Sequence, residues 1–461
     1  TLDDNQQKIV QDIKQSFRKP HPLLLPLTQG GFEPNELFDL IKTDAEMTVK
    51  ILNAVNSQSV IPLNRWLDGI FIRPIPMISW ELLVNNIGLK ANYHYFFHIS
   101  IHVLNIFLVY LLAKNLNLNF PVCILAACLF AIHPIHGSSL GWLSVRFDLL
   151  CVFFYTLSLN LFLYVLKKPR VIASLFTVIF FVLALLSKEM AVTLPLIASL
   201  IVWHDTKLKF EKKIVLITLI SLYFVLFVYM LLRFQIYDEG IGGYGEHHLK
   251  FDFSSLKYLL HALRALFIPV NTLWLESVYP AAGIIVSAVF VAFGLYICWR
   301  SFANSSNDSV LMLLLVLTIV CVPLLNISKV YSDLESSRFY YLPSVFFVIF
   351  LASWLVKERR IIQHLLVAFY AILSVAYLFV WANASIISRS VLGELSAYDT
   401  SCVASFSGLP DKVNGGFIYR NGFESAKVLF FNNQDAQGCT KMQVLNWQDN
   451  EWRASPPPIA P

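Results

Sequence analysis

Long apolar blocks separated by short polar segments fill most of this chain of 461 residues. A membrane-crossing helix needs roughly 15 to 21 mostly apolar residues, and ten blocks have about that length. They span residues 95–115, 120–134, 149–166, 171–187, 189–203, 214–233, 280–299, 309–326, 341–356 and 361–381. The pattern predicts an all-α polytopic membrane protein with about ten visible crossings, several of them short, as in bundles with tilted or buried helices.

Basic residues in the connecting loops predict which side of the membrane each loop faces. Lys and Arg concentrate in residues 167–170, 204–213 and 357–360, and loops on the cytoplasmic side are enriched in these residues. If residues 1–94 lie outside, all three basic loops fall on the inner side, which agrees with this bias. The polar segments at both ends of the chain then share the outer side.

All three basic loops fall on the inner side only if residues 255–275 do not cross the membrane. Lys257, His261 and Arg264 recur there at spacings of four and three, which places them on one helix face. An amphipathic helix that lies at the interface, or one that re-enters the membrane, fits this pattern better than a crossing.

The chain divides into three regions on this interpretation. Residues 1–94 form an outer-side loop with amphipathic helices, residues 95–384 the transmembrane core, and residues 385–461 a small outer-side domain. In the last region the pieces GGFIYR and KVLFF have a strand-like composition and are separated by Gly and Asn turn residues. We therefore expect an α/β or β domain there, with a disordered proline-rich end.

The stretch 37–60 allows a second interpretation of the N-terminal region. It resembles part of a bacterial HDOD signalling domain, a soluble helical module, and covers only a fragment of such a domain. We interpret it as amphipathic helices of the outer loop, lying on the membrane or capping a site. A cytoplasmic module would invert the orientation and place the basic loops outside, against the charge bias.

Composition agrees with a membrane protein and adds two points. Hydrophobic residues make up 57% of the chain and charged residues 14%, which is too apolar for a soluble domain of this length. The net charge of +5 resides largely in the basic loops, so it implies no nucleic acid partner. Among the cysteines, Cys402 and Cys439 lie in polar sequence, where a disulfide would suit an oxidising exterior. Two unrelated thiols are the alternative.

Charged residues directly beside apolar blocks need a partner or a function, because burial next to hydrocarbon is costly. Arg146, Lys188 and Arg338 each lie at the predicted outer end of such a block. A guanidinium or ammonium at this depth can neutralise a lipid-linked phosphate, which suggests an anion site. The alternatives are an ion pair of Arg146 with Asp148, a pair of Lys188 with Glu189, or interfacial snorkelling.

Histidines form two further groups near these ends. His133 and His136 flank a proline at which a helix ends; they can bind a phosphate or satisfy helix-terminal carbonyls. His94, His98 and His102 recur every four residues and share one helix face. A zinc site is one interpretation of the second group. No Cys or carboxylate accompanies it at ligand spacing, which favours polar contacts at the interface.

Five stretches of the chain together resemble one known family. In chain order they are LDDNQQKIV, FIRPIPMISWELLVNNIGLKANYHYFFHISIHVLN, LFAIHPIHGSSLGWLSVRFDLL, LALLSKEMAVTLP and SRFYYLPS. They resemble the transmembrane O-mannosyltransferases that in animals carry tetratricopeptide repeats, and the bacterial relatives of these enzymes in the GT-C glycosyltransferase superfamily. The C-terminal region has no period of about 34 residues, so it lacks such repeats.

The resemblance implies a GT-C-like helical bundle whose first helix precedes Thr1, and a transfer reaction on the outer side of the membrane. A mannose-like hexose would pass from a polyprenyl-phosphate donor to a hydroxyl of a protein, glycan or lipid. Asp3 and Asp4 would be catalytic, with Asp4 facing the donor as base while Asp3 holds the loop or a divalent cation, Mg or Mn. An N-terminal turn is the alternative for this pair. The donor phosphate would contact Arg146, Arg338, Lys188, His133 and His136, and further polar site candidates are Arg73, His94, Asp148 and Glu189.

Two function classes follow from these observations. The first is this sugar transfer, with membrane lipids, the lipid-linked donor and the acceptor as partners. Its location would be a bacterial inner membrane with a periplasmic site or, alternatively, the endoplasmic reticulum with a lumenal one. The second is a transporter or flippase of a lipid-linked or anionic substrate that uses Arg146, Asp148 and Lys188 along its path.

Two sequence features bear on this choice. Transporters place ionisable groups near the membrane midplane and often show inverted repeats, whereas the charges here lie at the ends of apolar blocks. A nucleotide-sugar enzyme of the Rossmann type is disfavoured, because no glycine-rich phosphate loop follows a strand. The sequence therefore favours the transferase.

Overall fold

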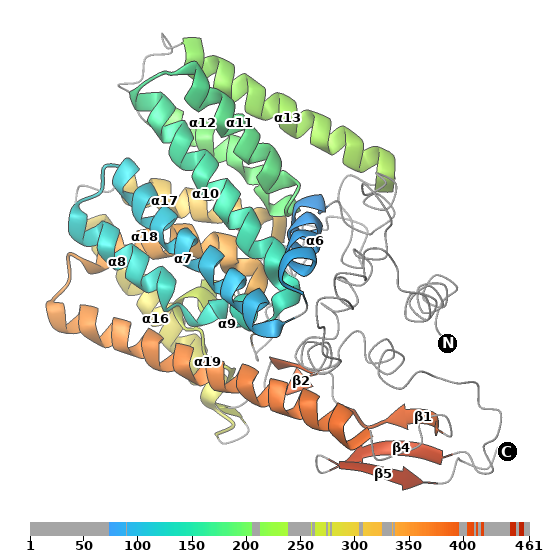
Figure 1. Ribbon diagram of the computed structural model, residues 1–461. Helices are drawn as coiled ribbons and strands as arrows, with labels where there is room; N and C mark the ends of the chain where they lie inside the picture. The colour runs from blue at the N-terminus through green and yellow to red at the C-terminus, as the bar shows by residue number, and fades with distance from the viewer. Residues whose placement is uncertain are drawn as a thin grey trace.

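The computed structural model is a bundle of packed helices (Figure 1). It describes residues 73–88, 90–204, 213–237, 279–303, 308–324 and 337–395, residues 260, 263–272, 275–276 and 334, and short segments between 403 and 455. The helices are α6 (Pro74–Ile87), α7 (Ala91–Asn115), α8 (Phe120–Ala131), α9 (Gly137–Gly141), α10 (Arg146–Lys167), α11 (Val171–Leu185), α12 (Leu194–His204), α13 (Lys213–Tyr237), α16 (Ala282–Ala303), α17 (Asp308–Cys321), α18 (Tyr341–Leu355) and α19 (Arg360–Leu395). Short 3-10 turns connect some of them: η1 (Pro134–His136), η2 (Leu143–Val145), η3 (Glu189–Thr193), η4 (Val322–Leu324) and η5 (Ser337–Tyr340).

Every predicted crossing coincides with a helix, and the helices differ in length. Five described segments are long and apolar enough to cross a membrane: Ala91–Asn115, Leu143–Lys167, Lys213–Gln235, Ser337–Leu355 and Arg360–Leu395. A sixth span results if α8 and the helical stretch Pro134–Gly141, which meet at a bend of 42°, are counted as one. The remaining predicted crossings are shorter apolar helices: Val171–Leu185, Glu189–His204, Ala282–Gly294 and Met312–Leu324. The length and composition of the helices therefore confirm the prediction of a helical membrane bundle.

Local sequence explains the first tight helical hairpin. Asn117 has a left-handed backbone (φ 60°) just past the end of α7, a conformation that Asn tolerates better than most residues. The Asn119 side chain then caps α8 by accepting a hydrogen bond from the Val122 amide, with a proline in the first turn. Lys167 at the end of α10 donates to the Asn115 carbonyl at 2.8 Å, so the two loop ends lie together.

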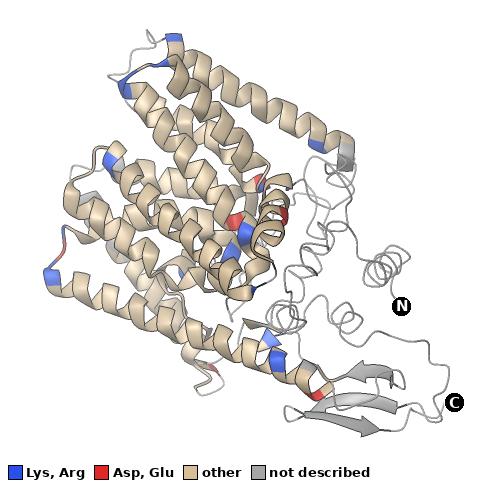
Figure 2. Ribbon diagram, viewed as in Figure 1, with Lys and Arg blue, Asp and Glu red and all other residues tan. Residues whose placement is uncertain are grey.

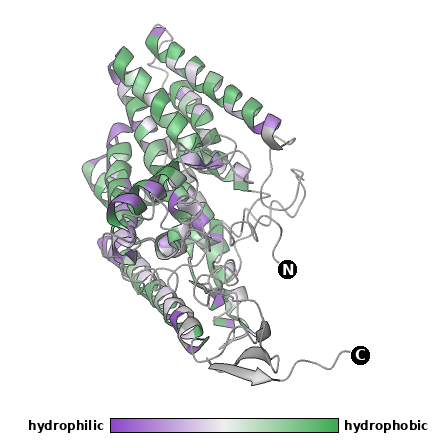
Figure 3. Cartoon of the chain, turned by 45° about the vertical axis from the view of Figure 1, so that its right-hand side comes forward, coloured by the Kyte–Doolittle hydropathy of each residue, from purple (hydrophilic) through white to green (hydrophobic). Residues whose placement is uncertain are grey.

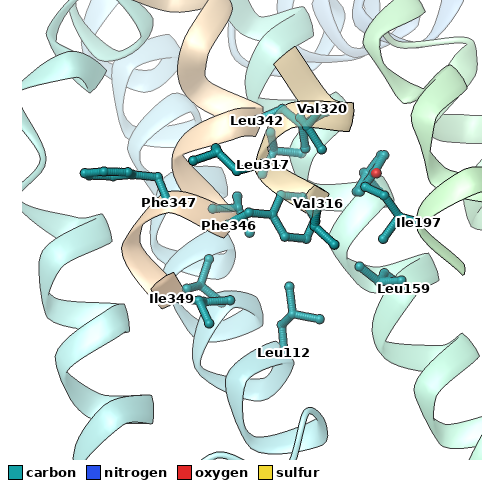
Figure 4. Close-up of a cluster of buried hydrophobic side chains, with 14 of the residues drawn as sticks. Leu112, Leu159, Ile197, Val316, Leu317, Val320, Leu342, Phe346, Phe347 and Ile349 are labelled. Carbon is teal, nitrogen blue, oxygen red and sulfur yellow. The ribbon is translucent and has the colours of Figure 1, made fainter. Parts of the chain in front are cut away.

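Helix α18 lies in the middle of the bundle and is buried on nearly all sides. Phe346 and Phe347 of this helix belong to one large core with Leu112 of α7, Leu159 of α10 and Val316 of α17 (Figure 4). A helix that is apolar all round is the kind that packs inside such a bundle. The close contacts of these side chains fix α7, α10 and α17 around α18.

Hydroxyl and amide side chains connect neighbouring helices. The Ser158 hydroxyl of α10 donates to the Thr177 carbonyl of α11 at 2.7 Å, and Ser174 of α11 bonds Thr218 of α13 at 2.6 Å. Hydrogen bonds of this kind stabilise helix pairs in membranes, where burial of apolar surface between helices gives little. The helices are hydrophobic over most of their length and more hydrophilic near their ends (Figure 3). Exposed apolar side chains on α13 and α19 therefore suit contact with lipid.

Many of the exposed cations lie at one end of the bundle (Figure 2). They sit on the connections α7–α8, α10–α11, α12–α13 and α18–α19 and include Lys114, Lys167, Lys213, Lys357 and Arg360. Consecutive helices joined by short loops run antiparallel, so these loops gather on one side. Which face of a membrane this end meets stays a prediction.

The segment 255–275 packs into the bundle where the structure describes it. Leu266 is completely buried, and its carbonyl accepts hydrogen bonds from His133 at 2.9 Å and from Tyr370 at 3.2 Å. Of the two alternatives, re-entry fits this part of the chain better than a helix lying on the surface. Lys257 and His261 lie outside the described residues.

Strands follow the last helix. β1 (Val403–Ser407) pairs in parallel with β4 (Gln443–Gln448), which pairs antiparallel with β5 (Glu451–Ser455), and a small hairpin joins β2 (Lys412–Val413) to β3 (Gly416–Phe417). β3 lies in the predicted piece GGFIYR, whereas KVLFF lies outside the described residues. The β4–β5 hairpin was not predicted. Both β2 and β3 contact α19, so this helix links the strands to the bundle.

Candidate functional site

Four cations lie at the starts of four helical segments. Arg73 is the residue before α6, Arg146 is the first residue of α10, Lys188 precedes η3, and Arg338 lies in η5 just before α18. A helix start carries partial positive charge and favours anions. Cations at these positions therefore add to the positive potential, and the cluster needs negative partners.

Two carboxylates supply part of that charge. Lys188 donates to Asp148, and both side chains are buried. Arg73 binds Glu189 through both carboxylate oxygens, with its Nη2 at 2.7 and 2.9 Å and its Nε at 3.2 Å. The pairs expected as alternatives, Arg146 with Asp148 and Lys188 with Glu189, are wrong. Arg146 and Asp148 are two apart on α10 and do not face each other, and Lys188 has extended backbone just before η3. The observed partners come from different segments of the chain.

Aromatic rings separate the cations from one another. The Phe147 ring lies 4.4 Å from the guanidinium carbon of Arg73 and 5.2 Å from the ammonium of Lys188. The Phe339 ring lies 4.5 Å from the same ammonium. Ring faces attract cations, so these contacts hold the charged groups in fixed positions inside the protein.

Arg338 joins the cluster through α9 and η2. Its guanidinium carbon lies 4.5 Å from the Trp142 ring, and the neighbouring Ser337 hydroxyl lies 3.0 Å from that of Ser138. The charge of Arg338 acts on Asp148 together with those of Lys188 and Arg73. The structure thus brings the predicted residues Arg73, Lys188, Arg338, Asp148 and Glu189 into one electrostatic unit.

Arg146 is the most buried cation of the group. Its side chain is 0% exposed, and its guanidinium carbon lies 3.1 Å from the centroid of the Trp80 ring and 4.9 Å from that of Phe97. It begins the same helix as Asp148, and its role in a phosphate site stays a prediction.

Arg233 was missed by sequence reasoning. It is buried on α13 and donates to Tyr229 at 3.4 Å, and the charges of Glu189 and Arg73 act on that tyrosine. Arg233 is the last residue of the predicted crossing 214–233. The aromatic partners Trp80, Trp142, Phe147 and Phe339 were also missed, although two of them directly follow a candidate arginine.

His133 and His136 are buried but differ in their bonds. His133 Nε2 donates to the Leu266 carbonyl, and its Nδ1 accepts from the Ile135 amide at 3.2 Å. Both nitrogens are therefore engaged by the protein, which matches the carbonyl-satisfying alternative, and we leave His133 out of the proposed site. His136 Nε2 lies 2.8 Å from the Ser344 hydroxyl.

His94, His98 and His102 share one buried face of α7, as their spacing predicts. His94 and His98 donate through Nε2 to the carbonyls of Gly88 at 3.0 Å and Ser139 at 2.6 Å. His102 Nδ1 lies 2.6 Å from the Tyr341 hydroxyl. These contacts are polar contacts inside the bundle rather than at its interface. Over the described ranges, no group of three or more His, Cys, Asp or Glu side chains could hold a metal ion.

Several predicted features lie outside the described residues. These are the acidic pair Asp3 and Asp4 with its divalent cation, the Cys402–Cys439 disulfide and the stretch 37–60. Comparison with known protein families, with characterised proteins and with solved structures found no match for this chain. The resemblance to GT-C enzymes therefore stays a prediction.

Proposed function

We propose that this protein is an integral membrane glycosyltransferase of the GT-C type. It moves a mannose-like hexose from a polyprenyl-phosphate-linked donor to a hydroxyl of a protein, glycan or lipid acceptor on the outer side of the membrane. The observation that carries this proposal is the cluster of buried cations at helix starts, opposite the end that bears the exposed basic loops.

The donor's chemistry explains why such a cluster lies at a helix end. Its isoprenoid tail belongs in the bilayer, whereas its phosphate and sugar belong at the membrane surface. Arg146, Lys188 and Arg338 come from the starts of different helical segments and supply positive charge at that level. Fixed charges in a water-poor site stabilise developing negative charge more strongly than water does.

The proposed sugar transfer needs a group that stabilises the leaving phosphate and a group that accepts the proton of the acceptor hydroxyl. The acceptor oxygen forms a bond to the anomeric carbon, and the bond between that carbon and the phosphate oxygen breaks. The polyprenyl phosphate leaves with the bonding electrons, so its negative charge grows near the cations. The acceptor's proton passes to a carboxylate. Asp4 is the proposed base; Asp148 and Glu189 are already paired with cations, which suits them less to this role.

The placement of the charges supports this proposal over the transporter alternative. A transporter would carry ionisable groups near the middle of its helices. Here Arg146, Asp148 and Lys188 lie within the first turn of α10 or just before η3. Flipping of a lipid-linked substrate without transfer remains the competing outcome that an experiment can detect.

The test uses the full chain reconstituted in lipid nanodiscs. Labelled polyprenyl-phosphate mannose and a panel of hydroxyl acceptors are supplied, and labelled product is measured with release of polyprenyl phosphate. We expect transfer by the wild type and a loss of roughly 100-fold or more in Arg338→Gln. The control Lys114→Gln removes an exposed cation at the other end and should leave the rate unchanged. Labelled donor that crosses vesicle membranes with no product formed would refute the transferase and support the flippase.

A further inference from the structure

Arg146 differs from Arg73 and Lys188 in its hydrogen bonds. Its side chain is completely buried, and none of its three guanidinium nitrogens has a hydrogen-bond partner in the part of the chain that the structure describes. Lys188 and Arg73, by contrast, are each bound to a carboxylate. A buried guanidinium that lacks an acceptor is strongly unfavourable, so such groups are nearly always paired or bind a ligand.

Two aromatic rings hold Arg146 without using its donors. The Trp80 ring of α6 lies 3.1 Å from the guanidinium carbon, and the Phe97 ring of α7 lies 4.9 Å from it. A guanidinium stacks on rings through its flat faces, while its N–H groups point outward in the plane. The stacking therefore fixes the orientation of Arg146 and leaves its donors for an acceptor.

Residues around Arg146 carry further polar atoms that have no partner in the described part of the chain. They are Nδ1 of His94, Nδ1 of His98 and the hydroxyl of Ser139, all buried and without a partner among the described residues. The charge of Arg146 acts on both histidines, and His98 contacts the Ser139 carbonyl. The Trp80 and His94 rings lie 5.5 Å apart. We call this group the Arg146 pocket: Arg146, His94, His98, Ser139 and the covering Trp80.

The pocket offers donors and acceptors together. Nε2 of each histidine donates to a backbone carbonyl, so in the neutral ring Nδ1 is an acceptor. Arg146 offers only donors, and Ser139 can do either. This set complements a ligand that carries both an anion and hydroxyl groups. A phosphate ester of a sugar has both.

We propose that the Arg146 pocket is the phosphate-ester subsite of this protein, and that Trp80 is its cover. Phosphate oxygens accept from the guanidinium edge of Arg146, and hydroxyl groups of the ligand donate to His94 and His98. The inference rests on the proposed function, since a lipid-linked sugar phosphate is its intended occupant.

Entry of the ligand requires a movement of α6. The helix starts at the Arg73–Glu189 pair and at a hydrogen bond from the Ile75 amide to the Leu186 carbonyl at 3.3 Å. Trp80 lies one and a half turns beyond these attachments and is 1% exposed. A tilt of α6 about its attached start uncovers Arg146 without breaking the ion pair.

Direct binding tests this assignment independently of any transfer. Purified full-length protein is titrated with undecaprenyl phosphate, with inorganic phosphate and with the neutral alcohol undecaprenol, and affinities are compared between variants. We expect Arg146→Gln to weaken binding of undecaprenyl phosphate by roughly 10- to 100-fold, the effect of losing charged hydrogen bonds. The double variant Lys188→Met/Asp148→Asn should lose less, and the control Lys114→Gln nothing.

The outcomes separate the alternatives. Unchanged affinity in Arg146→Gln, a larger loss in the double variant, or equal binding of undecaprenol would overturn the assignment. Absence of binding by any phosphate in the wild type would also overturn it and leave a pocket that holds water only. Binding of inorganic phosphate as tight as that of the lipid would identify a free phosphate as the ligand. If Arg146→Gln does not fold, Arg146→Lys replaces it. We then expect a several-fold loss of affinity for undecaprenyl phosphate, and an unchanged affinity would count against the pocket. Binding that depends on Arg146 without sugar transfer would refute the proposed function alone.

Discussion

The buried Lys188–Asp148 pair gives the sharpest stability prediction. Lys188 is 1% exposed and Asp148 5%, so neither group can turn to water when its partner is lost. Removing one partner of such a pair leaves an uncompensated buried charge, at a cost of about 3–5 kcal/mol. Lys188→Met keeps the length of the side chain and removes its charge.

The size of the effect follows from this burial. At roughly 2 °C per kcal/mol, Lys188→Met should lower the apparent melting temperature by about 6–10 °C. Lys188→Met/Asp148→Asn removes both charges and should recover most of that loss, because a neutral pair of similar volume replaces the ion pair. The exposed control Lys167→Met should change stability by about 0.5 kcal/mol or less.

The assay is thermal unfolding of detergent-purified protein followed by tryptophan fluorescence, with the same lipid content in all samples. A double variant as unstable as Lys188→Met would refute the reasoning, because the cost would then come from lost packing instead of an unpaired charge. Equal stability of Lys188→Met and wild type would show that water, a proton or another cation compensates Asp148.

Three other predictions address topology, chemistry and packing. A thiol at Tyr244→Cys should react with an impermeant reagent from outside and one at Glu211→Cys should not; labelling of the second site alone would contradict the orientation. Asp4→Asn should lower turnover by roughly two to four orders of magnitude with donor binding retained, whereas Arg338→Ala should weaken both; the reverse pattern would make Asp4 structural. Gly141→Ala should destabilise by about 1–3 kcal/mol, because the added methyl would lie 2.5 Å from an α19 tryptophan ring; unchanged unfolding would mean that the ring shifts freely.

The helices could be predicted because each depends on a continuous run of apolar residues. The central position of α18 could not, since α13 is also apolar along its length and yet exposes many large apolar side chains. Burial inside a bundle depends on which helices surround it, and no local pattern carries that information. The β4–β5 hairpin was missed for another reason: its strands are short, and the strand prediction rested on the pieces GGFIYR and KVLFF.

The sequence identified which residues belong to the candidate site, but it did not identify which of them form ion pairs with each other. Charges beside apolar blocks identified Arg146, Lys188 and Arg338, because such positions are costly without a partner or a function. Their partners come from other helices and depend on how those helices rotate about their axes. The hydrogen-bond partner of His133 could not be predicted for the same reason, because its acceptor, the carbonyl of Leu266, is far away in the sequence.

The two ends of the bundle hold the same residue types in opposite surroundings. Lys114, Lys167 and Arg360 are exposed at one end and need no compensation. At the other end Arg146 and Lys188 are buried among aromatic rings, where each cation costs several kcal/mol after relaxation. A buried charge contributes little to stability even when it is paired, so stability alone does not account for these buried cations. The proposed anionic ligand would account for them, because its binding would compensate charge that the described carboxylates leave over, as at Arg146.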